Sequence, residues 1–168
     1  MSNLAGPVPL NKDHECQGFD CGKEALNQFI EKHALANQSN NSARTFVALD
    51  GNKVAGYYSL AASAIVHEDA PARLAKGLAR HPIPIVLMAR FAVDRRYQGK
   101  GLGSALFKDA IKRTLNVSKD LGARAFVVHA KDDDAKRLYE HFNMEPFEGN
   151  PFHLYLLMKD IETTLSLR

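Results

Sequence analysis

The sequence contains no apolar run near the length that a membrane span needs, about 20 residues. Its first ten residues, MSNLAGPVPL, combine neither a basic stretch nor an apolar stretch, so they do not predict a secretion signal. Only two cysteines occur, Cys16 and Cys21, which are too few for a disulfide framework or a cysteine-rich metal site. These absences predict a cytoplasmic protein with reduced cysteines and no membrane association.

The chain has 168 residues, of which 45% are apolar, so we expect one folded domain, residues 1–168, with a substantial core. The net charge is only +3, but it is unevenly distributed. Residues 71–113 contain ten Lys and Arg against two Asp, a net charge of +8, which leaves −5 for the rest. This concentration indicates a polyanionic partner, although a solvated basic surface explains the same pattern.

Apolar periodicity predicts strands and helices in alternation. Helical spacing predicts helices over residues 19–38, 102–115 and 132–142, with Asp20 as the N-cap of the first. Strands are predicted over residues 7–14, 44–50, 53–66, 83–93, 123–130 and 152–160, and a basic loop or short helix over residues 68–82. This order predicts an α/β (α+β) fold with a mixed central sheet flanked by helices.

The stretch RRYQGKGLGSAL, residues 95–106, places three glycines between an apolar strand and a helix. The first N–H groups of a helix point at an anion there, and the helix dipole adds about half a positive charge. Glycine lets the backbone approach a ligand closely because it has no Cβ. Residues 98–104 are therefore predicted to bind a phosphate or a pyrophosphate.

Two common phosphate-binding motifs fit this loop poorly. A P-loop has Lys and a hydroxyl residue directly after its second glycine, whereas Leu102 follows Gly101 here. A dinucleotide-binding fingerprint requires a third glycine at a spacing that is absent, and an acidic residue about 20 positions on that is not evident. The pattern that fits is Gln-x-x-Gly-x-Gly, formed by Gln98, Gly101 and Gly103.

This pattern follows a strand ending in FAVD and resembles the pyrophosphate-binding motif of the GNAT superfamily of N-acetyltransferases. The stretch ARAFVVHA, residues 123–130, resembles the next core strand of that fold. The stretch DAKRLYEHFNMEPF resembles its A-x-x-x-Y-x-x-x-G-F element, with Asn143 and Met144 in place of Gly and Phe. Further segments along nearly the whole chain are similar, in order, to the TacT-type branch, the bacterial GNAT toxins of type II toxin–antitoxin systems.

The resemblance implies the GNAT acyl-CoA N-acyltransferase fold and a function. It implies a toxin that transfers acetyl from acetyl-CoA to the α-amino group of an aminoacyl-tRNA, which blocks translation. It also implies a cognate ribbon-helix-helix antitoxin and a homodimer. The alternative is a GNAT acetyltransferase of a protein or small-molecule amine, and a non-catalytic acyl-CoA- or RNA-binding module is a third interpretation.

The resemblance also assigns roles to residues. It places Tyr139 at the sulfur of the cofactor as the general acid, a role that suits a phenol with a pKa of about 10, although a core aromatic explains the same spacing. The residues expected to bind acetyl-CoA are Phe91, Ala92, Val93, Gln98, Gly99, Lys100, Gly101, Leu102, Gly103, Ser104, Asp133 and Lys136. The basic residues expected to contact tRNA are Arg73, Lys76, Arg80, Arg90, Arg95 and Arg96.

No carboxylate stands out as a general base. An α-amino group, with a pKa of about 8, needs such help less than a lysine with a pKa of about 10.4, so the absence favours an aminoacyl ester as the acceptor. His129 is the best candidate for a base, but a structural role is the stronger interpretation. The three consecutive aspartates, residues 132–134, are predicted to cap the following helix, and no metal is expected.

Overall fold

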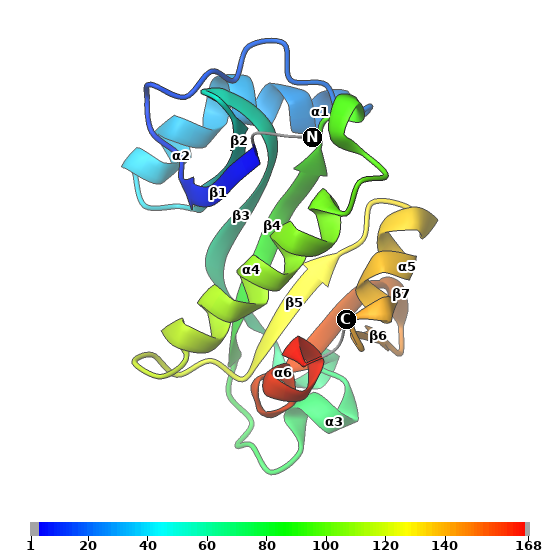
Figure 1. Cartoon of the computed structure of the whole chain (residues 1–168). Coiled ribbons are helices and arrows are strands. Elements are labelled where there is room, and N and C mark those ends of the chain that lie inside the picture. Colours follow the sequence, from blue (N-terminus) through cyan, green and yellow to red (C-terminus); the bar gives the residue numbers. More distant parts are fainter. Residues whose placement is uncertain (1–3, 167–168) are drawn as a thin grey trace. The chain divides into compact units, whose positions relative to one another are not determined.

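The computed structural model describes residues 4–166 and contains a seven-stranded sheet flanked by helices (Figure 1). The strands are β1 (Leu4–Pro9), β2 (Arg44–Asp50), β3 (Lys53–Ile65), β4 (Ile83–Val93), β5 (Ala125–His129), β6 (Glu145–Phe147) and β7 (Asn150–Leu157). They are hydrogen-bonded in the order β1-β2-β3-β4-β5-β7-β6. β4 and β5 are parallel, whereas β5 and β7 are antiparallel, so the sheet is mixed and the predicted fold class is confirmed.

The helices connect these strands. They are α1 (Glu24–Gln28), the π-helical turn η1 (Phe29–His33), α2 (Ala34–Ser39), the 3₁₀ turn η2 (His67–Asp69), α3 (Ala72–Ala75), the 3₁₀ turn η3 (Arg95–Tyr97), α4 (Leu102–Val117), α5 (Asp133–His141) and α6 (Met158–Leu165). Among residues 4–166, none of these helices combines the length and the apolar character that a membrane crossing requires.

The first predicted helix differs from the structure at its start and in its middle. Asp20 is not the N-cap, because the helix begins at Glu24 after Lys23, and the Asp20 side chain instead accepts a hydrogen bond from the amide of Gly22 at 3.0 Å. Gly22 has a φ of +95°, which turns the chain before the helix starts. The π-helical turn then adds a residue to one turn, and His33, its last residue, is exposed.

The C-terminal region also differs from the prediction. The expected strand over residues 152–160 ends at Leu157, and α6 follows at once with Ile161 and Thr164 buried. β6 was not predicted, because three residues that include Pro146 form no alternating pattern. The strand expected over residues 7–14 lies earlier, as β1.

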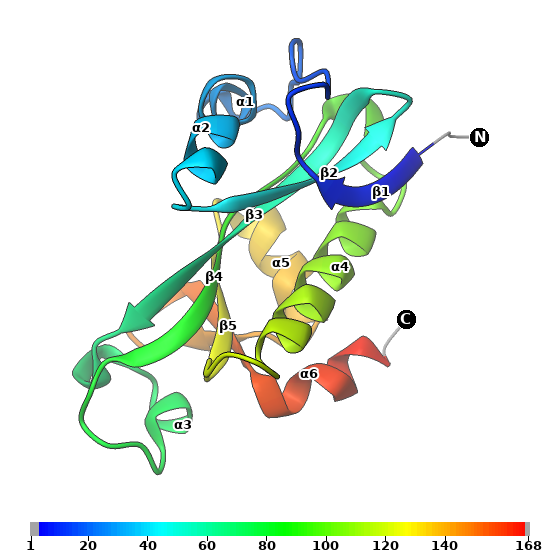
Figure 2. The ribbon, with the colours of Figure 1, turned by 90° about the vertical axis from the view of Figure 1, so that its left-hand side faces the viewer.

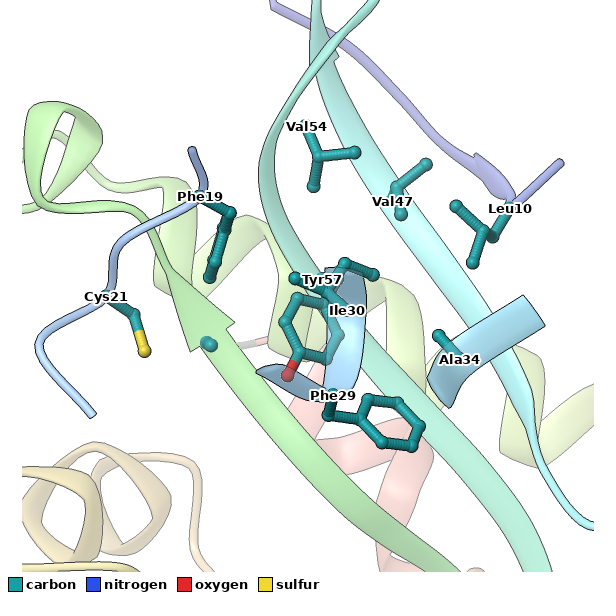
Figure 3. Packing of buried hydrophobic residues seen from close by; sticks show 10 residues of the cluster. Leu10, Phe19, Cys21, Phe29, Ile30, Ala34, Val47, Val54 and Tyr57 are labelled. Carbon is teal, nitrogen blue, oxygen red and sulfur yellow. The ribbon is translucent and has the colours of Figure 1, made fainter. Parts of the chain in front are cut away.

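The chain forms two compact units, each described by itself. The first contains the described residues up to Ala61 together with Ala89–Ala110. In it, α1 and α2 lie on one side of β2 and β3 (Figure 2). Figure 3 shows its core, in which the Tyr57 ring meets Phe19 edge-on at 5.5 Å and stacks on Phe29 at 6.1 Å, while its hydroxyl donates to the carbonyl of Leu26 at 2.7 Å. These contacts hold the helical segment against the strands.

The second unit contains Ala62–Met88 and the described residues from Ile111 onward. Its core is formed by Leu74, Ile83, Ile85, Ala125, Val127, Tyr155 and Leu157. Because α3 has only four residues, it depends on tertiary contacts, and Leu74 is fully buried. The guanidinium of Arg124 donates to the carbonyls of Leu74 and Lys76 at 3.0 Å each, which satisfies the C-terminal end of α3.

Candidate functional site

In the first unit, the chain leaves β4 through a tight turn built on Asp94. Its backbone amide donates to the carbonyl of Ala55 at 2.9 Å, which holds the turn on β3. The Asp94 carboxylate is 1% exposed and accepts hydrogen bonds from the amides of Asp20 and Arg96 at 3.0 and 2.9 Å. It also accepts from Nε and a terminal nitrogen of the Arg96 guanidinium, both at 3.0 Å. Sequence reasoning missed this residue as a positioning group, although it ends the FAVD stretch that precedes the glycine loop.

Burial and hydrogen bonding act on the Asp94 carboxyl in opposite directions. Burial raises its pKa, but the hydrogen bonds from Arg96 and from the amide of Asp20 lower it, and the net pKa lies below the usual value. Asp94 is therefore ionised at neutral pH and fixes the residues that enter the glycine loop.

The side chain of Gln98 braces the loop from inside. Its amide nitrogen donates to the carbonyl of Val93 at 2.8 Å and to that of Cys21 at 3.3 Å. The Gln-x-x-Gly-x-Gly pattern thus begins with a residue that ties the loop to the end of β4 and to the segment before α1. The structure gives Gln98 a positioning role toward its own backbone.

The glycines after Gln98 leave the start of α4 open. Gly99 and Gly101 have φ values of +77° and +86°, and a Cβ at either position would meet no atom within 4 Å. The carbonyl of Gly101 accepts from the amide of Ala105 at 3.1 Å, so α4 begins here and its first N–H groups have no intrahelical partners. Lys100 is exposed, and no acidic residue occupies the first turn. The loop has the geometry and charge of an anion site.

A glycine on β3 lets α4 lie close to the sheet. A Cβ on Gly56 would lie 2.8 Å from Cδ1 of Leu106 and 3.2 Å from the carbonyl oxygen of Ala92. Leu106 and Ala92 are fully buried. No sequence pattern indicates this contact, because an isolated glycine in a strand pattern does not show which residue it lies against.

In the second unit, Tyr139 lies on α5 behind a capped helix start. The side chain of Asp132 accepts from the amide of Ala135 at 2.9 Å, which confirms the predicted cap, while Asp133 is exposed. Tyr139 is 3% exposed, and burial, together with the nearby charge of Asp132, raises its pKa above the ordinary value. Its hydroxyl therefore remains protonated through the physiological pH range. Lys136 pairs with Glu140 at 3.6 Å.

Four of the six basic residues expected to contact RNA have partners within their own units. Arg73 pairs with Glu145 and Asp160, and Arg96 with Asp94. Arg95 lies 3.6 Å from a carboxylate oxygen of Asp20, and the Arg90 guanidinium lies 3.9 Å from the centre of the Phe29 ring. Within the described part of the chain, Lys76 and Arg80 have exposed side chains and no ion-pair partner, so they are the most available for an external phosphate.

The rings of His129 and His153 stack at 3.8 Å on paired positions of β5 and β7. Burial of part of its ring, and then the neighbouring His153, lower the pKa of His129. Both imidazoles line a cavity that sequence reasoning missed, because its walls come from segments far apart in the chain.

Comparisons with known proteins identify the family of the chain. Residues 41–143 match the sequence model of the acetyltransferase (GNAT) domain. The tRNA-acetylating toxin of Mycobacterium tuberculosis is 39% identical over 160 residues, covering 95% of this chain and 96% of that protein. The structure of AtaT complexed with acetyl-methionyl-tRNAfMet is similar, with a TM-score of 0.88 and 29% identity over 98% of this chain and 100% of that chain. A tyrosine-to-phenylalanine mutant of AtaT, bound to the C-terminus of the antitoxin AtaR and to acetyl-CoA, gives a TM-score of 0.83 and 28% identity over 99% and 100%.

Proposed function

The chain belongs to the GNAT acetyltransferase family, and we propose that it is a toxin that transfers acetyl from acetyl-CoA to the α-amino group of an aminoacyl-tRNA. The observation that carries the proposal is the open loop of residues 98–104 in a chain that resembles a tRNA-acetylating toxin along nearly its whole length. The loop provides the anion site, and the relatives provide the substrate class.

The residues of the loop fit the pyrophosphate of acetyl-CoA. The open faces of Gly99 and Gly101 leave room beside the backbone, and the first N–H groups of α4 donate without competition from an acidic side chain. Leu102, Gly103 and Ser104 supply these N–H groups, and Lys100 adds a positive charge. We assign Phe91, Ala92 and Val93, at the end of β4, to the acetyl carbonyl through a backbone N–H.

Tyr139 is assigned the general-acid role. When bound, acetyl-CoA supplies an acetyl thioester, and transfer forms a C–N bond and breaks a C–S bond. Tyr139 donates its phenolic proton to the departing sulfur, and the proton lost by the attacking amine restores the balance. Because burial raises its pKa, the hydroxyl is fully protonated before transfer. We also assign contacts with the cofactor to Asp133 and Lys136, in the first half of α5.

We assign binding of the substrate RNA to the basic residues. Lys76 and Arg80, exposed and without ion-pair partners in the described residues, are expected to contact phosphates directly. The positive charge of the other four residues is partly balanced by ion pairs or an aromatic contact within the chain; they are Arg73, Arg90, Arg95 and Arg96. They contribute to the field that attracts RNA more than to individual contacts.

The partners of the toxin follow from the same family. AtaT binds the antitoxin AtaR, and we propose that this chain has a cognate antitoxin of the ribbon-helix-helix type. We further propose that the chain is a single domain over residues 1–168, that it forms a homodimer and that it acts in the cytoplasm, where charged tRNA is found.

The test is incubation with acetyl-CoA and total charged tRNA, followed by identification of the N-acetylated aminoacyl groups. Native protein is expected to acetylate aminoacyl-tRNA. Tyr139→Phe is expected to lower the rate by about 10²- to 10⁴-fold, the usual contribution of a general acid, while acetyl-CoA binding is retained. Acetyl-CoA affinity is measured by calorimetry.

The matched control is Tyr155→Phe, which removes the hydroxyl of another buried tyrosine of the same unit. This variant is expected to keep the native rate. Acetyl groups that appear only on protein or on small amines would refute the tRNA substrate. A Tyr139→Phe rate equal to that of Tyr155→Phe would refute the role of Tyr139.

A further inference from the structure

The second unit contains a cavity of about 670 Å³, and none of its lining residues has a role in the proposed mechanism. We call it the acidic cavity. It lies between the end of β3 with the turn that follows, the early part of β4, the end of β5 and the β6–β7 hairpin. Its volume falls in the range of about 300–1,000 Å³ that is typical of small-molecule sites.

Apolar side chains form much of the cavity wall. Ile65, Ile85, Leu87, Val127 and Phe147 line it, and they come from four different strands. At the rim, the Val66 side chain is 56% exposed. This wall suits an apolar group of modest size.

The charged groups of the cavity all have one sign. Glu68, Asp69 and Glu148 line it, and among its described lining residues there is no Lys or Arg. The other titratable groups are His129 and His153, and the lowered pKa of His129 favours the neutral imidazole at neutral pH. In a chain of net charge +3, this cavity repels phosphate and attracts a cation.

We propose that the acidic cavity binds a primary ammonium group attached to an apolar side chain, which is the chemistry of an aminoacyl end. This inference rests on the proposed function, and it assigns the aminoacyl group of the substrate to this cavity and the phosphates elsewhere. The carboxylates attract the ammonium group, and the aliphatic wall receives the side chain. It follows that tRNAs charged with apolar amino acids are preferred over those charged with aspartate or glutamate.

Binding is tested first without tRNA or acetyl-CoA. Leucine methyl ester is titrated into the full-length protein carrying isotope-labelled histidine, and the imidazole resonances of His129 and His153 are followed by NMR. Both are expected to shift with one saturation curve. N-acetyl-leucine methyl ester lacks the ammonium group, and glutamate α-methyl ester carries an acidic side chain, so both are expected to bind at least several-fold more weakly. Equal binding of all three esters, or no shift at either histidine, would overturn the proposal.

Two substitutions test whether the ligand binds in the cavity. Ala64→Phe adds a large ring at an exposed position of the cavity lining, and it is expected to abolish ester binding. Its control is Ala72→Phe, an exposed alanine of the same unit outside the lining. Glu148→Gln is expected to weaken ester binding about two- to five-fold, and its control Glu162→Gln is expected to leave it unchanged. Native affinity in Ala64→Phe would overturn the proposal.

The transfer assay then separates this inference from the proposed function. If no aminoacyl-tRNA is acetylated, the proposed function fails, whatever the esters do. If aminoacyl-tRNAs are acetylated but aspartyl- and glutamyl-tRNA react as well as leucyl- and methionyl-tRNA, only the cavity assignment fails. The expected result is a preference for leucyl- and methionyl-tRNA. This preference is expected to be lost in Ala64→Phe and retained in Ala72→Phe.

Discussion

Replacing Asp94 is expected to destabilise the first unit more than replacing any of its polar neighbours. Its carboxylate accepts four hydrogen bonds of 2.9–3.0 Å, two from the backbone amides of Asp20 and Arg96 and two from the Arg96 guanidinium. The residue is 1% exposed, so water cannot easily replace the lost acceptor. Asp94→Ala therefore leaves two amide donors and a cation without their partner.

The magnitude follows from the asymmetry of the pair. Removing one member of a buried ion pair costs about 3–5 kcal/mol, and the Arg96 side chain is 52% exposed and can rehydrate, so we expect about 3 kcal/mol for Asp94→Ala. Asp94→Asn keeps the volume and one acceptor oxygen but turns an NH₂ group toward donors, and we expect about 2 kcal/mol. Arg96→Ala leaves the buried carboxylate without its cation but with both amides, so its cost is expected to be about 2 kcal/mol, less than that of Asp94→Ala.

Urea unfolding at neutral pH measures these differences, with Asp120→Ala at an exposed site as the control. The pH dependence gives a second reading. The pKa of Asp94 is lower in the folded state, so its contribution is present above about pH 4 and is lost as the pH falls through the folded value. Asp94→Asn lacks this loss. An Asp94→Ala midpoint equal to that of Asp120→Ala would refute the reasoning.

Two further predictions concern a close packing contact and a buried phenol. Gly56→Ala places a methyl group 2.8 Å from Leu106, and we expect the free energy of unfolding to fall by about 1–3 kcal/mol. We also expect weaker acetyl-CoA binding, measured by calorimetry. Native values of both quantities would contradict this prediction. Because the pKa of Tyr139 is raised in the folded state, its phenol ionises just above pH 10 only in the unfolded state. Native protein is therefore expected to lose stability in that pH range. Tyr139→Phe is expected to lose less between pH 8 and about pH 11 in urea unfolding, and identical losses would contradict the assignment.

The parts of the fold that the sequence predicted are those with long local patterns. The hairpin of β2 and β3, the apolar strand β4 and the helix α4 follow from alternation, apolar runs and helical spacing, and they appear within a few residues of the predicted bounds. The glycine loop was recognisable because an anion site at a helix start needs a backbone that only glycine adopts freely. Asp132 was predicted as a cap for a similarly local reason.

The parts that the sequence did not predict depend on partners far away in the chain. Asp94 accepts from an amide 74 positions earlier, and nothing in the FAVD pattern names that donor. The closeness of Gly56 to Leu106 also appears only when β3 and α4 are folded. The π-helical turn departs from the period of about 3.6 residues that periodicity analysis assumes. Residues from five strands line the acidic cavity, so no single window of sequence contains it.

The distribution of charge links these features to one kind of substrate. A net charge of +8 over residues 71–113 attracts a polyanion. In contrast, the titratable groups among the described residues that line the cavity of the second unit are carboxylates and imidazoles. A metabolite with charge of a single sign would be attracted by one of these environments and repelled by the other. An aminoacyl-tRNA carries many phosphates and one amino group that is a cation when protonated, so it needs both. The two opposite environments therefore argue for this substrate over a polyamine, which the basic segment repels, and over an acidic metabolite, which the cavity repels.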